Sequence, residues 1–203
     1  MTITTAQIKE LREETGVGIM DCRKALENAN GNFDEALEFL REKGLSKAAE
    51  RADREASEGM VELYSHGNGR VGVMVEVNCE TDFVARADKF RSFAHEIALQ
   101  IAASAPLYIS EQDIPEEVLE EERNLARDYA IGEGKPENII DRIVEGRIKK
   151  YLDETCLLRQ PYIRDDEINV EQLLMQNIAA IGENVVIRRF QRFELGENAS
   201  DSE

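Results

Sequence analysis

The sequence contains no tryptophan and only two histidines, and its three cysteines lie far apart at Cys22, Cys79 and Cys156. Neither His66 nor His95 is followed by another metal ligand three or four residues later, so the spacing typical of a helical zinc site is missing. The cysteines are too distant in sequence to form a ligand pair or a redox motif. We therefore expect no metal ion, no cofactor and a reduced, cytoplasmic protein, or an organellar one if a transit peptide has been removed.

The motifs of several enzyme classes are also missing. There is no Gly-x-x-x-x-Gly-Lys phosphate loop and no Gly-x-Ser-x-Gly nucleophile elbow. Gly67-Asn-Gly69 is better interpreted as a turn than as a phosphate-binding loop. The carboxylates are too many and too evenly spread to nominate a catalytic pair, so nothing in the sequence indicates an enzyme or a catalytic residue.

Basic residues are scarce, because 25 Lys and Arg stand against 42 Asp and Glu and give a net charge of −17. A phosphate backbone is bound by clustered Lys and Arg, so we expect no nucleic-acid partner. The excess of acid is explained equally well by a basic protein partner and by solubility alone. No apolar run reaches the length of a membrane span and the N-terminus has no signal-peptide pattern, so we expect no membrane association.

The first 44 residues have the pattern of three short helices. The pairs Thr4/Gln7 and Asn32/Glu35 each have the spacing of an N-terminal cap, which places the starts of the first and third helices. Asn30-Gly31 is expected to stop the second helix, and we expect the third to end at Gly44. This pattern predicts a small three-helix bundle of the ubiquitin-associated kind over residues 1–44.

Residues 45–58 lack a clear apolar stripe, and we expect them to form a solvated, partly helical linker. The core domain is predicted over residues 59–196, followed by a polar tail at 197–203. In the core, Val71–Cys79 alternates apolar and polar residues, as in a strand with one buried face. Other strands are expected just before it and near the C-terminal end, with helical spacing between. The predicted fold class is α+β, with a three-stranded antiparallel meander packed with helices.

The valine-rich strand ends where Glu80-Thr-Asp-Phe-Val-Ala-Arg86 begins, and apolar residues then recur at helical spacing. We expect the strand to pass directly into a helix, with Thr81 or Asp82 capping its unpaired N–H groups. Capping does not explain Phe83 beside a charged residue. Two interpretations stay open here: Phe83 is either the first core residue of the helix or an exposed ring.

Ile19 and Met20 present a similar choice. They lie at the turn and the start of the second helix, outside that helix's own apolar stripe. They either help to fill a thin core or form an adaptable apolar contact surface, for which methionine is well suited.

Three segments together resemble the elongation factor Ts family of bacteria and organelles. They are Leu11–Leu26, Asn78–Arg86 and, more weakly, Val144–Lys150, and they lie in the order found in that family. The resemblance implies a guanine-nucleotide exchange factor for elongation factor Tu that binds the GDP form, displaces Mg²⁺ and lets GTP replace GDP. It also implies that the core domain is of the dimerisation type.

The resemblance assigns roles to particular residues. The residues implied in displacing Mg²⁺ from elongation factor Tu are Thr81, Asp82, Phe83 and Val84. The residues implied in docking onto the nucleotide-binding domain of that partner are Arg12, Ile19 and Met20. Family members often have Met at the position of Ile19, and an apolar contact is preserved by either residue.

Longer members of the family carry two copies of the sheet-and-helix unit, whereas this chain has one. The resemblance therefore implies a homodimer, in which the mate supplies the second copy and two partners are bound. The alternative function is a ubiquitin-associated-like interaction module that binds a protein partner through the Gly16–Gly18 loop. The match at residues 71–86 and the domain behind it argue against that alternative.

Overall fold

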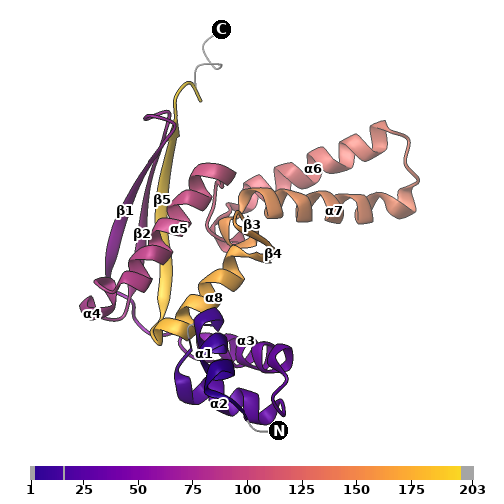
Figure 1. The fold of residues 1–203 in the computed structure, drawn as a ribbon. Helices are drawn as coiled ribbons and strands as arrows, with labels where there is room; N and C mark the ends of the chain where they lie inside the picture. Colours follow the sequence, from indigo (N-terminus) through magenta and orange to yellow (C-terminus); the bar gives the residue numbers. More distant parts are fainter. Residues whose placement is uncertain (1–2, 16, 198–203) are drawn as a thin grey trace. The chain divides into compact units, whose positions relative to one another are not determined.

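The computed structural model describes residues 3–15 and 17–197, and its fold is α+β, as the sequence predicts (Figure 1). The helices are α1 (Thr5–Thr15), α2 (Ile19–Asn28), α3 (Phe33–Ala49), α4 (Asp82–Ala85), α5 (Asp88–Ser104), α6 (Glu116–Gly132), α7 (Glu137–Thr155) and α8 (Val170–Ile181), with 3₁₀ turns η1 (Glu111–Asp113) and η2 (Leu157–Arg159). The strands are β1 (Glu58–His66), β2 (Val71–Cys79), β3 (Pro161–Tyr162), β4 (Asp165–Asn169) and β5 (Val185–Glu194).

The chain divides into two compact units, each assembled from separate segments. One unit contains the chain up to Tyr64 together with Val73–Ala98 and Gln172–Gln191, and the other contains Ser65–Gly72, Leu99–Glu171 and the chain from Arg192. The domain limits expected from the sequence, at residues 44, 58 and 196, remain a proposal. Beyond Glu197, the predicted polar tail lies outside the described residues.

Local capping interactions build the bundle of α1, α2 and α3. The Thr4 N–H donates to Oε1 of Gln7 at 3.0 Å and the Gln7 N–H donates to the Thr4 hydroxyl at 3.3 Å, which is the predicted capping box. Oδ1 of Asn32 accepts from the first N–H groups of α3, also as predicted. The core of the bundle consists of Leu11, Cys22, Ala25, Leu26, Ala29, Ala36 and Leu40. Alanines make up much of this core, so the bundle buries little apolar surface.

Helix α3 does not end at Gly44, as the sequence suggested, but continues to Ala49. A glycine inside a helix costs only about 1 kcal/mol relative to alanine, so it does not by itself terminate one. At Gly44 a Cβ would lie 3.1 Å from Cβ of Ala179 in α8, so the missing side chain allows close packing. The predicted linker is therefore helical at its start, as expected, but shorter than the composition indicated.

The strands β1, β2 and β5 form an antiparallel sheet with β2 in the centre. The turn between β1 and β2 holds Gly67, Asn68 and Gly69 at positive φ, which is the conformation that their sequence favours. On β2, Val73, Val75 and Val77 are buried, in agreement with the predicted alternation. Figure 1 places α5 along one face of the sheet, and the His95 ring on α5 is hydrogen-bonded to Glu62 of β1 at 2.8 Å.

The chain does not pass from β2 into a single continuous helix, which corrects the sequence-based expectation. It forms the one-turn helix α4, which ends at Ala85, then makes a turn at Arg86–Ala87 and begins α5 at Asp88. In a continuous helix, Phe83 and Phe90 would share a face because they are seven residues apart. The interruption separates them, and Phe90 is fully buried whereas Phe83 is not.

The second unit is built around the antiparallel hairpin of α6 and α7, whose start positions after Pro115 and Pro136 agree with the sequence. Its core contains Ile114, Leu152 and Cys156. The short hairpin of β3 and β4 was not predicted. It is fastened by buried Gln100, which donates to the Pro161 carbonyl at 3.1 Å and accepts from the Ile163 N–H at 2.9 Å.

Across residues 3–15 and 17–197, no helix combines the length and the apolar character needed to cross a membrane. In the same residues, no cluster of three or more His, Cys, Asp or Glu side chains is arranged to hold a metal ion. All three cysteines are free and buried.

Candidate partner-binding site

Thr81 uses its own polar groups to fix the corner between β2 and α4. Its backbone N–H donates to Oε2 of Glu183 at 3.0 Å, and its hydroxyl donates to Oε1 of the same carboxylate at 2.7 Å. The hydroxyl oxygen accepts from the Val84 N–H at 3.4 Å and so caps α4, one of the alternatives expected from the sequence. The Thr81 carbonyl accepts from the Ala85 N–H at 3.2 Å. Thr81, although exposed, therefore fixes the corner through its backbone and its hydroxyl.

The other residues of the corner point in different directions. Val84 is buried and anchors α4 to the core, whereas the Phe83 side chain is 81% exposed. Asp82 is also exposed and forms an ion pair with Arg86 at 2.9 Å. The structure thus selects the exposed-ring interpretation of Phe83 and brings Asp82 and Phe83 together on the outer side of the corner.

A second carboxylate, that of Glu80, joins the same two segments, and here the segment before Thr81 supplies the acceptor. Oε1 of Glu80 accepts from the Asn184 N–H at 2.6 Å and lies 3.5 Å from Nη1 of Arg54. Glu80–Thr81 and Glu183–Asn184 therefore hold one another through one glutamate from each side. Hydrogen bonds to ionised carboxylates are stronger than those between neutral groups, so this junction resists bending.

Cys79 lies directly beneath the corner. Its thiol donates to the Thr81 carbonyl with an Sγ–O distance of 3.2 Å, and its side chain is fully buried. Burial, followed by the nearby negative charge of Glu183, raises the pKa of Cys79 to about 11. The thiol is therefore protonated at neutral pH and acts as a hydrogen-bond donor rather than as a nucleophile.

A second exposed apolar patch lies on the N-terminal bundle. Ile19 and Met20 open α2 with side chains that are 54% and 62% exposed, so they do not fill the bundle core. Arg12 is exposed on α1, which packs against α2. All of these predicted docking residues are thus accessible to a partner. The alternative Gly16–Gly18 binding loop cannot be described as a whole, because Gly16 lies outside the described residues.

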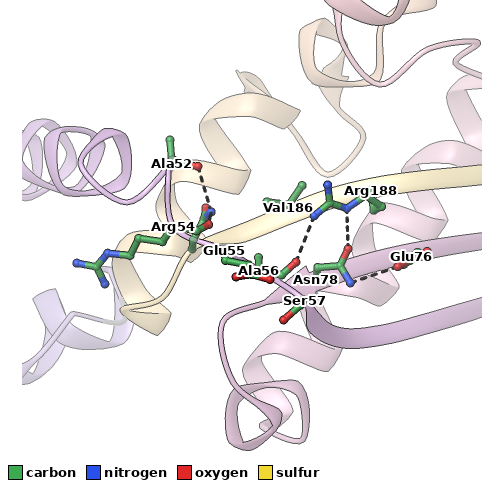
Figure 2. Close-up of a pocket in the computed structure, with 10 residues that line it drawn as sticks. Ala52, Arg54, Glu55, Ala56, Ser57, Glu76, Asn78, Val186 and Arg188 are labelled. Atoms are coloured by element: carbon green, nitrogen blue, oxygen red, sulfur yellow. Dashed lines mark hydrogen bonds between the residues drawn. The ribbon is translucent and has the colours of Figure 1, made fainter.

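The end of the linker is bound to the sheet rather than solvated, which corrects the sequence-based expectation. Side-chain N–H groups donate to alternate backbone carbonyls along it: Asn184 to Ala52 at 3.3 Å and to Arg54 at 2.8 Å, Arg188 to Ala56 at 3.2 Å, and Asn78 to Glu58 at 3.2 Å. Figure 2 shows Arg188 between Ala56 and Asn78, where its Nε donates to Oδ1 of Asn78 at 3.0 Å. Except for Glu58, these residues line an open pocket of about 520 Å³.

Comparison with known proteins decides the family. The model of the family described as Elongation factor TS matches residues 4–197. The chain belongs to the elongation factor Ts family. It is 59% identical over 195 residues to elongation factor Ts of Caldanaerobacter subterraneus subsp. tengcongensis, covering 96% of this chain and 98% of the relative. It is 56% identical over 201 residues to elongation factor Ts of Carboxydothermus hydrogenoformans, covering 99% of this chain and 93% of the relative.

Membership of the elongation factor Ts family makes this protein a factor of translation elongation. The relatives extend over nearly the whole chain, so both exposed patches belong to the matched region. The sequence pointed to the corner but missed Glu183, Asn184 and Arg188, which hold the corner and the linker in place. Gly182-Glu-Asn184 has the composition of a turn, and nothing local indicates that its side chains reach residues more than 100 positions away.

Proposed function

We propose that this protein is a guanine-nucleotide exchange factor that binds elongation factor Tu with GDP bound and promotes release of the GDP. The observation that carries this proposal is the Phe83 ring, 81% exposed at the tip of a corner that Thr81 and Glu183 hold from behind. Burying such a ring in a partner would recover about 2 kcal/mol of hydrophobic free energy. We place this function in the cytoplasm, in keeping with the free cysteines.

The proposed mechanism displaces an ion rather than forming a covalent bond. GDP in a GTPase is held partly through Mg²⁺, which demands nearly ideal octahedral coordination. Phe83 would enter the partner beside this ion, and Asp82 would exchange its contact with Arg86 for polar contacts in the partner. Thr81, through its hydrogen bonds, and Val84, through its buried side chain, would keep the Phe83 ring in position as it contacts the partner. Phe83 and Asp82 would in this way distort the coordination of the ion, which would weaken the partner's hold on Mg²⁺ and on GDP.

The bundle would supply a separate part of the binding energy. Arg12, Ile19 and Met20 are exposed and would dock on the nucleotide-binding domain of elongation factor Tu. Affinity from this patch holds the complex together whether or not nucleotide is present. The corner provides the difference between these states. Linkage requires that this protein weaken the binding of GDP to elongation factor Tu by the same factor by which GDP weakens the binding of this protein.

The bare face of the sheet favours the homodimer and the complex of two copies with two partners. On β1 and β2 the side chains that alternate with the buried positions include Val61, Leu63 and Met74, all about half exposed or more. A face of this kind is a candidate contact for a second copy, since an isologous interface needs one self-complementary apolar patch. We therefore propose that two chains associate through this face.

The experiment that tests the exchange function is release of a fluorescent GDP analogue from elongation factor Tu. We expect the native chain to accelerate release and Phe83→Ala to lower the maximal rate at least about tenfold, as for loss of a central aromatic contact. Tyr129→Ala, which truncates a half-exposed ring on α6, is the control and should behave like the native chain. Equal acceleration by both variants would remove Phe83 from the mechanism, and no acceleration by the native chain would refute the proposed function.

A further inference from the structure

The segment Glu183–Asn184, between α8 and β5, contacts both the corner and the linker. The Glu183 carboxylate accepts the backbone N–H and the hydroxyl of Thr81, and the Asn184 N–H donates to Glu80. The Asn184 side-chain amide is 2% exposed and donates to the carbonyls of Ala52 and Arg54. One dipeptide thus fixes the position of the residue that precedes Asp82–Phe83 and the path of the chain that leads from the N-terminal bundle.

We propose that Glu183 and Asn184 are positioning residues for nucleotide exchange. Glu183 sets the direction of Phe83, and Asn184 limits the freedom of the linker that joins the sheet to the bundle bearing Ile19 and Met20. This inference rests on the proposed exchange function. Neither side chain needs to touch the partner, because each acts through a backbone segment that carries a partner-contacting residue.

For Glu183 the argument is geometric. Thr81 is the N-cap of a helix only one turn long, and Phe83 lies two residues after it. The Thr81 N–H comes before α4, where no helical carbonyl can accept it, so the Glu183 carboxylate supplies the acceptor. The same carboxylate holds the Thr81 hydroxyl, which in turn receives the Val84 N–H. Removing Glu183 therefore releases both groups that orient the turn bearing Phe83.

For Asn184 the argument is the pattern of acceptors. Carbonyls of residues 52, 54, 56 and 58 are bound in succession, and Asn184 provides the first two contacts, farthest from the sheet along the linker. Arg188 provides the next one and is itself exposed. Without Asn184, the anchored part would begin only at Ala56. The segment that leaves α3, itself packed on α8 at Gly44, would then lose the anchor nearest the bundle, and the bundle patch would be held less precisely for docking.

The two positions therefore predict different kinetic defects. Loss of Glu183 should lower the maximal rate of GDP release, about tenfold for the loss of a charge-assisted hydrogen bond, with the half-saturating concentration of the factor little changed. Loss of Asn184 should raise the half-saturating concentration several-fold and leave the maximal rate near the native value. A role confined to stability would lower the melting temperature without separating these two parameters.

The test is a saturation series of GDP release from elongation factor Tu for the native chain, Glu183→Ala, Glu183→Gln and Asn184→Ala. Glu183→Gln keeps one acceptor oxygen and should recover part of the maximal rate. Glu120→Gln removes an equal charge from an exposed position on α6 and is the control for electrostatic steering. Because Asn184 is buried, Arg188→Ala serves as a second linker variant that releases the Ala56 carbonyl from an exposed side chain.

Amide hydrogen exchange provides a second readout that needs no partner. In Glu183→Ala, the N–H groups of Thr81 and Val84 should exchange faster than in the native chain. If Phe83→Ala slows release but Glu183→Ala matches the native rate, the positioning role of Glu183 is overturned while the exchange function stands. If the linker variants keep the native half-saturating concentration, the role of Asn184 fails. If the native chain does not accelerate GDP release, the exchange function fails. If the Thr81 N–H in Glu183→Ala is protected from exchange as well as in the native chain, the anchoring of the corner by Glu183 is overturned too.

Discussion

At the scale of single residues, the corner between β2 and α4 contains two kinds of residue: those that hold its shape and those that are available to contact a partner. Thr81, which the family resemblance counted among the contact residues, has its hydroxyl engaged by Glu183, and Val84 is buried beneath it. Asp82 and Phe83 are left exposed at the surface. The sequence could not decide whether Phe83 is buried or exposed. The outcome depends on the interruption of the helix between α4 and α5 and on Glu183, which lies 102 residues after Thr81.

The buried thiol of Cys79, beneath the corner, makes the free energy of unfolding depend on pH. The pKa of Cys79 is raised from 9.0 to about 11 by burial and by Glu183, so the folded chain keeps a proton that the unfolded chain releases between these values. The stabilisation is complete below pH 9, and the free energy of unfolding should fall as the pH rises from 9 towards 11. Urea denaturation across this range should follow a shallower decline in Cys79→Ala than in the native chain.

Cys22 and Cys156 are buried with raised pKa values as well, mainly through desolvation, so some alkaline loss should persist in the variant. Identical slopes for Cys79→Ala and the native chain would show that the Cys79 thiol has no such linkage.

At the scale of elements, short-range signals were sufficient for most helices and for the valine strand. Caps, prolines and positive-φ turns act within a few residues, and the predicted starts of α1, α3, α6 and α7 follow from them. The errors have distant causes. Helix α3 passes through Gly44 where Ala179 packs closely, and the hairpin of β3 and β4 depends on Gln100, about 60 residues earlier.

Helix α3 offers a direct test of how much one cap contributes to the small bundle. Asn32→Ala removes the acceptor for the Asp34 and Glu35 N–H groups, and we expect it to destabilise the bundle by about 1 kcal/mol. Asn32→Asp keeps an oxygen acceptor and should be nearly neutral. Thermal unfolding followed by circular dichroism, with amide exchange in α1, α2 and α3, measures the loss. Equal destabilisation by both variants would mean that the cap oxygen is not the source of stability.

At the scale of the whole molecule, the acidic chain has an uncovered sheet face that composition alone did not reveal. The alternation along β2 correctly predicted one buried face, but a two-sided pattern cannot say what lies on the other. Val61, Leu63 and Met74 remain exposed there in the single chain.

If a second copy covers this face, Leu63→Glu should place a carboxylate in the interface and raise the dissociation constant of the dimer at least about 100-fold. Sedimentation equilibrium would then give the mass of one chain for the variant and of two for the native protein. Leu125→Glu, at an exposed leucine on α6, should leave the dimer intact. A native chain that sediments as a monomer, or a variant that still pairs, would exclude this face as the contact.

The linker from Ala52 to Glu58 is held mainly through its main-chain carbonyls, together with the ion pair between Arg54 and Glu80. Every residue type carries the same carbonyl, so the donors on Asn78, Asn184 and Arg188 cannot distinguish one linker sequence from another. Apart from Arg54, which pairs with Glu80, and Ala56, whose methyl group is buried, this stretch can change its side chains while its course stays the same. The course of the linker is thus determined by side chains that lie outside it, and most substitutions within the linker are expected to leave that course unchanged.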